Sequence, residues 1–138
     1  MTMIPTLSHL QEINHVHSRK SLALLRECLD CKGVYGAILS SIDGNALLQV
    51  LERDLSADRL ATMNSSILAL AETIARESGQ QQCRFVILEN GNGRLVSLRV
   101  NQTLLMTCIS NKESNLGMVL NISQRTASAL AKVVSEFE

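Results

Sequence analysis

Two short glycine-containing turns constrain the fold of this chain more than any other feature. Asp43-Gly44-Asn45 separates one pair of apolar runs, and Asn90-Gly91-Asn92-Gly93 separates another. Asn, Asp and Gly tolerate the positive φ angles of tight hairpin turns. Strands joined by so few residues run antiparallel, because a parallel neighbour requires a crossover of about a dozen residues or more. The sequence therefore predicts an antiparallel sheet and excludes a doubly wound, Rossmann-like sheet.

Five short apolar runs are the expected strands, and segments with helical periodicity surround them. The strands are expected at residues 34–41, 46–51, 83–89, 94–100 and 103–109. The helices are expected at residues 7–31, with a less regular polar beginning at 6–17, at 56–79 behind an N-cap at Ser56, and from 114 onward. The predicted fold is one α/β (α+β) domain of order α-β-β-α-β-β-β-α, spanning residues 21–138 behind a helical or flexible extension at residues 1–20.

Composition excludes several classes of protein. The chain has 138 residues, 46% of them apolar, and 13 basic side chains balance 13 acidic ones. No Lys/Arg-rich run provides the footprint that holds a phosphate backbone, so nucleic acid is not an expected partner. No apolar run approaches the roughly 18 residues of a membrane helix, and the N-terminus has no signal-peptide pattern. We therefore expect a cytoplasmic protein without membrane insertion.

The helix expected after Ser56 carries more apolar surface than a helix lying on its own sheet needs. One stripe consists of Leu60, Met63, Ile67, Leu70 and Ile74, and a second of Ala61, Leu68, Ala71 and Ala75. No charge lies between Leu60 and Ala71, and the polar residues there are small: Thr62, Asn64, Ser65 and Ser66. We expect these small side chains on an outer face, where they allow close approach of another helix. The alternative is that they simply face water.

The run Phe85-Val86-Ile87-Leu88 supports a second protein surface independently. A strand that is apolar on both faces is covered on both sides. At a sheet edge such a strand needs protection, which pairing with a copy of itself provides. The expected dimer interface therefore comprises Leu60, Met63, Ile67, Leu70, Ile74, Phe85 and Ile87.

Several motifs suggest chemistry but fit structural roles better. Cys28 and Cys31 have the spacing of half a metal site, but no second pair completes it. The imidazoles of His9, His15 and His17 fit a solvated polar segment better than a metal site. The sequence Gly91-Asn92-Gly93 precedes a strand, whereas a phosphate loop precedes a helix. No catalytic set, metal site or cofactor site is therefore expected, and we predict a protein that binds partners and is not an enzyme.

Three strings resemble the roadblock / dynein light chain domain family, specifically its bacterial and archaeal members. They are GAILSSIDG at residues 36–44, ADRLATM at 57–63 and NLG at 115–117, and the resemblance covers residues 21–134. It implies a profilin-like sandwich around a five-stranded antiparallel sheet, which homodimerises through its central helix and third strand. It also implies regulation or scaffolding of a Ras-like small GTPase, and the family has no agreed catalytic residue to transfer.

The second partner is expected to bind near the charged start of the central helix, at Arg53, Asp58 and Arg59. A cation there is placed to act as an arginine finger on a partner's phosphoryl group. The alternative is a pair of solvated arginines at a helix entry. Two other functions stay open at this stage, a passive scaffold subunit of a larger complex and a small-molecule sensor.

Overall fold

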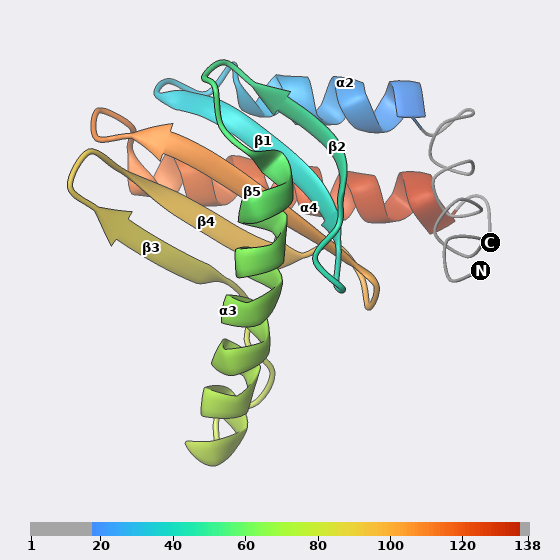
Figure 1. The fold of residues 1–138 in the computed structure, drawn as a ribbon, viewed down its shortest axis with the longest axis vertical. Coiled ribbons are helices and arrows are strands. Elements are labelled where there is room, and N and C mark those ends of the chain that lie inside the picture. Colours follow the sequence, from blue (N-terminus) through green and yellow to red (C-terminus); the bar gives the residue numbers. More distant parts are fainter. Residues whose placement is uncertain (1–17, 136–138) are drawn as a thin grey trace.

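The computed structural model describes residues 18–135, and they form one sheet with helices on both of its faces (Figure 1). The elements are α2 (Ser18–Cys28), β1 (Val34–Ser41), β2 (Ala46–Leu51), α3 (Ala57–Glu77), β3 (Val86–Asn90), β4 (Gly93–Arg99), β5 (Leu104–Asn111) and α4 (Leu116–Ser135). This order is the predicted α-β-β-α-β-β-β-α. The extension predicted at residues 1–20 lies mostly outside the described residues.

The five strands form one antiparallel sheet of order β2-β1-β5-β4-β3. The two hairpins supply the outer pairs β1-β2 and β3-β4, and β5 joins them at the centre. Helices α2 and α4 lie side by side against one face, and α3 crosses the other (Figure 1). Strands β2 and β3 are therefore the two edges of the sheet.

The main hydrophobic core lies between the sheet and the α2/α4 layer. Its side chains are aliphatic or contain sulfur, and they include Leu25, Cys28, Ala37, Leu39, Val96, Leu98, Leu104, Met106, Cys108, Val119 and Leu130. A smaller cluster beneath α3 is centred on Ile38, Ala57 and Ile109. Because the larger core needs only two helices and one sheet face, α3 contributes little to it.

Polar contacts attach α3 to the sheet. The buried Asn64 donates from Nδ2 to Thr107 Oγ1 (2.9 Å) and accepts at Oδ1 from Ser97 Oγ (3.0 Å). Thr62 Oγ1 donates to the Gly44 carbonyl (3.1 Å) and Ser65 Oγ to the Ile42 carbonyl, both at the β1-β2 turn. Further along, Arg99 Nε lies 2.5 Å from Glu72 Oε1.

These contacts correct the orientation predicted for α3. Thr62, Asn64 and Ser65 do not form an outer face, because each hydrogen-bonds to the protein's own sheet or turn. Of the four small polar residues, only Ser66 is exposed without such a contact, and it bonds back to the Thr62 carbonyl within the helix. A small polar residue on a helix can face water or bond to a buried hydroxyl group. The sequence pattern is the same in both cases, so it did not distinguish an exposed face from a buried one.

The predicted boundaries of the sheet also need two corrections. Strand β3 begins at Val86, so Cys83 and Phe85 precede it. Gly44 has the positive φ expected of a hairpin turn (97°), but Gly91 and Gly93 do not. Position 93 requires glycine because there is no room for a side chain: a Cβ there would overlap the carbonyl oxygen of Ser110. Among the described residues, no helix is long and apolar enough to cross a membrane.

Candidate functional site

The candidate site begins with the apolar stripe of α3, which the protein's own fold leaves open. The buried side of this helix carries Ala57, Ala61, Asn64 and Leu68. Met63, Leu70 and Ile74 are 53%, 62% and 58% exposed. We call Leu60, Met63, Ile67, Leu70 and Ile74 the α3 stripe; Leu60 and Ile67 are half-buried. Exposed apolar side chains aligned on one helix are typical of a protein interface.

The second half of α3 extends beyond the sheet. No residue of this helix after Leu68 is buried, although it continues to Glu77. Figure 1 shows this half projecting past the strands, accompanied by the segment that leads to β3. A helix segment as short as residues 69–77 is only marginally stable in water on its own, because the unfavourable nucleation of a helix is not offset by its few hydrogen bonds. The projecting half therefore has the character of an element that needs a partner.

Next to the α3 stripe, part of the sheet is also uncovered. Leu60 faces a hollow of about 250 Å³ lined in part by Tyr35, Leu95 and Ile109. Leu88 pairs with Leu95 across β3 and β4, so it lies on the same face at the open edge of the sheet. The α3 stripe thus meets this strip of sheet at Leu60, in a hollow that polar side chains such as Asn92 and Arg94 also line.

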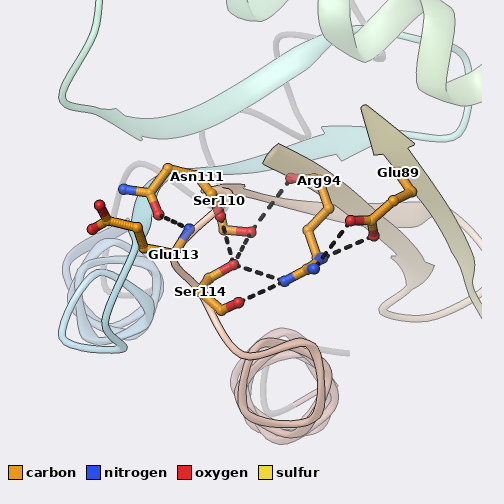
Figure 2. A network of polar contacts seen from close by, with 6 residues as sticks. All are labelled: Glu89, Arg94, Ser110, Asn111, Glu113 and Ser114. Carbon is orange, nitrogen blue, oxygen red and sulfur yellow. Dashed lines mark hydrogen bonds and ion pairs between the residues drawn. The ribbon is translucent and has the colours of Figure 1, made fainter. Parts of the chain in front are cut away.

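A polar network fixes the hairpin that borders this hollow (Figure 2). Arg94 binds Glu89 through two hydrogen bonds of 3.0 Å, from Nε and Nη2 to the two carboxylate oxygens. Its Nη1 donates to the Ser114 carbonyl (2.8 Å) and hydroxyl (3.0 Å). Hydrogen bonding from Arg94 lowers the pKa of Glu89. The guanidinium thus ties β3 and β4 to the turn that starts α4, which keeps the hairpin rigid.

The three residues predicted to bind a second partner lie around the start of α3. Arg53 lies over the Tyr35 ring, with its guanidinium carbon 3.8 Å from the ring centre, and it lines the hollow. Asp58 and Arg59 are exposed and line a different, shallower depression with Met63. The structure therefore separates Arg53 from Asp58 and Arg59, and both groups border the α3 stripe.

Phe85 and Ile87 do not lie with the α3 stripe. Both are partly buried against the main core, and Ile87 pairs with Val96, whose side chain is in that core. The residues of β3 on the α3 side are Val86 and Leu88. The placement of Phe85 and Ile87 in an interface remains a prediction. Its support is the position of β3 at the open edge of the sheet.

Sequence reasoning missed Tyr35 and Leu95 as parts of this surface, and it named the run that contains Leu88 without choosing Leu88 as an interface residue. Each was assigned to a strand but not to a face, because hairpins fix strand direction without saying which side a helix covers. Alternation contained part of the signal: Leu95 and Ser97 face α3, whereas Val96 and Leu98 face the main core. The hydrogen bond between Asn64 and Ser97 shows which face of the sheet α3 covers, and this contact cannot be read from the sequence.

The cysteines contribute to packing. Cys28 and Cys108 are buried, and the Cys28 thiol lies 3.2 Å from Thr126 Oγ1. A hydrogen bond between the two thiols lowers the pKa of Cys28 and raises that of Cys108. Within residues 18–135, no group of three or more His, Cys, Asp or Glu side chains is placed to hold a metal ion. The expectation for the three histidines at residues 9, 15 and 17 lies outside the described residues.

A two-helix layer, a five-stranded antiparallel sheet and a single crossing helix define a profilin-like sandwich with an open apolar face. The model of the Roadblock/LC7 domain matches residues 20–110, and the chain belongs to this family. The family and the sandwich fold are those that the sequence predicted. No curated protein sequence matches the chain.

Solved structures support the same fold. A structure described as MglB with tetrameric arrangement has a TM-score of 0.80 and 22% identity, covering 86% of this chain and 90% of that one. The gliding protein MglB of Thermus thermophilus has a TM-score of 0.79 at 20% identity, with the same coverage of both chains. Profilin IA of Acanthamoeba castellanii has a TM-score of 0.58 at 15% identity, covering 80% of this chain and 96% of that one. At these identities the likeness concerns the fold alone.

Proposed function

We propose that this chain is a homodimeric regulatory or adaptor module that binds a Ras-like small GTPase and has no catalytic centre of its own. The observation that carries the proposal is the α3 stripe, whose apolar side chains lie open beside the free edge of β3. The family membership supports a regulatory or adaptor role. The structural neighbours include MglB described with a tetrameric arrangement, which is consistent with self-association.

Self-association through this surface is energetically reasonable. Covering a half-exposed Leu, Ile or Met side chain contributes about 1 kcal/mol or more. Met63, Leu70 and Ile74 from each of two copies supply six such side chains. The edge of β3 adds unpaired backbone donors and acceptors that a second β3 satisfies when the strands align antiparallel. When α3 meets α3 and β3 meets β3 around one two-fold axis, both subunits use the same surface, and the assembly closes as an isologous dimer.

Light scattering tests the dimer. We expect wild-type protein to have twice the chain mass, and Leu70→Asp to shift it to the mass of one chain. A carboxylate that must lose water in the interface costs several kcal/mol without a partner. Leu70 is exposed in the protomer, so this variant keeps the fold, whereas a charge at Phe85 would also disturb the main core.

Thr73→Asp is the matched control, since Thr73 is exposed on the same half of α3 but lies off the stripe. Its new carboxylate lies one turn from Arg76, which already bonds the Thr73 hydroxyl. We expect an unchanged dimer. A dimeric Leu70→Asp variant, or a monomeric Thr73→Asp variant, would place the interface elsewhere.

GTP hydrolysis by the Ras-like protein of the native host tests the second partner. We expect the dimer to bind it preferentially in one nucleotide state, and Arg59→Ala to weaken this binding without changing the dimer mass. A change in hydrolysis rate on adding the dimer assigns a regulator. Binding without any rate change would assign the passive scaffold instead, and no binding in either nucleotide state would remove the GTPase from the proposal.

A further inference from the structure

The charges of this neutral chain are distributed unevenly over its two faces. Helices α2 and α4 carry the basic side chains Arg19, Lys20, Arg26, Arg125 and Lys132, and a single acidic one, Glu27. Helix α4 has no acidic residue over its 20 positions. In the adjoining turns, Asp30 is balanced by Lys32 and Glu113 by Lys112. As far as residues 18–135 are concerned, the two-helix layer therefore has an excess of positive charge that the net charge of the chain hides.

Four of these cations point away from the core. Arg19 and Arg26 are seven residues apart, as are Arg125 and Lys132, so each pair lies on one side of its helix about 10 Å apart. All four are exposed, and within residues 18–135 none of them forms an ion pair. Lys20 has an interaction within the chain, so we define the basic face as the other four residues.

The two helices place these pairs next to each other. Cys28 at the end of α2 contacts Thr126 in the middle of α4, and the helices lie side by side (Figure 1). Packed helices lie about 8–10 Å apart. Met118, seven residues before Arg125, lies on the same side of α4 and is 57% exposed. The basic face is thus a broad surface of four charges with an apolar side chain at its border.

We propose that the basic face binds the surface of an anionic lipid bilayer, with α3 directed away from it. A face made of two adjacent helices matches a plane, and Arg and Lys beside an exposed Met suit lipid headgroups over a shallow apolar boundary. Nucleic acid is disfavoured, because single strands are held by aromatic stacking, and both aromatic side chains within residues 18–135, Tyr35 and Phe85, belong to other parts of the fold. The docking is peripheral and leaves the α3 stripe accessible.

Vesicle flotation tests this proposal with the full chain. The probes are vesicles of equimolar phosphatidylcholine and phosphatidylserine, and vesicles of phosphatidylcholine alone. We expect binding only to the anionic vesicles, and weaker binding as salt is added. Each charge removed is expected to lower the partition coefficient about fivefold. Arg19→Gln/Arg26→Gln and Arg125→Gln/Lys132→Gln should each lose more than about tenfold, and the quadruple variant should not float.

Arg76→Gln, compared with the single variant Arg26→Gln, is the control, because each removes one exposed cation and Arg76 lies on α3, across the sheet from the basic face. We expect it to float like the wild type. Equal binding to neutral vesicles, or equal losses in the control, would overturn the proposal. Tighter binding to a single-stranded RNA oligomer or to poly-glutamate, lost in the same Arg and Lys variants, would also overturn it and assign the face to nucleic acid or to an acidic protein.

Discussion

At the scale of the residue, Gly93 shows how a position can require glycine for space alone. Its φ is not positive, so no backbone conformation excludes other residues. A Cβ, however, would overlap the Ser110 carbonyl oxygen and approach the Asn111 Cα to 3.0 Å. Both obstacles are backbone atoms of the central strand β5, which cannot move without disturbing the sheet. We expect Gly93→Ala to lower the free energy of unfolding by about 2 kcal/mol or more.

Gly91 provides the matched control two residues away in the same hairpin. A Cβ there meets nothing within 4 Å, and its φ is not positive either. Alanine at such a position restricts the unfolded chain, so Gly91→Ala should be neutral or stabilise by up to about 1 kcal/mol. Urea unfolding at one protein concentration compares the two variants. Similar losses in both would show that the hairpin depends on glycine flexibility and not on this close approach.

At the scale of the element, the strands and helices were largely predictable because their signals are local. Ser56 accepts a hydrogen bond from the Arg59 backbone N–H (3.2 Å), as an N-cap should. Gly33 ends the turn after α2 with a positive φ of 89°. Asn115 accepts from the Met118 N–H (3.0 Å) and starts α4. In each case a few neighbouring residues determine the local backbone, so the pattern predicts the structure.

The orientation of α3 was less predictable, because it depends on strands far away in the sequence. Asn64 is buried at 3% exposure only because Ser97 and Thr107 present hydroxyl groups beneath it. Nothing near Asn64 in the sequence indicates those partners. The sequence showed the two apolar stripes of the helix. Which stripe packs on the sheet depends on the side chains of the sheet, and the helix sequence does not contain that information. The sequence therefore predicted the candidate site on α3 and at the edge strand, but it missed Tyr35 and Leu95 on the sheet beside the helix.

At the scale of the whole molecule, the two faces of the sheet have different physical characters. One presents an apolar helix stripe and an open strand edge, and the other presents two helices with exposed cations. Under the two proposals they bind different partners without competing, since α3 and the α2/α4 layer lie on opposite sides (Figure 1). Average composition hides this division, because opposite charges on different faces cancel in a net charge of zero.

The thermal midpoint of the whole protein should therefore depend on its concentration. If folding and pairing through α3 are coupled, mass action stabilises the dimer by about 1.4 kcal/mol for each tenfold rise in concentration. Dividing this free energy by the unfolding entropy of two chains gives a rise of about 2 °C in the thermal midpoint for each tenfold rise in concentration. Ile74→Asp, whose wild-type side chain is 58% exposed in the protomer, should unfold at a lower and concentration-independent temperature. Scanning calorimetry over about a hundredfold range of concentration measures both. A wild-type midpoint that does not move would mean that the protomer is stable alone and that the open α3 stripe serves another partner.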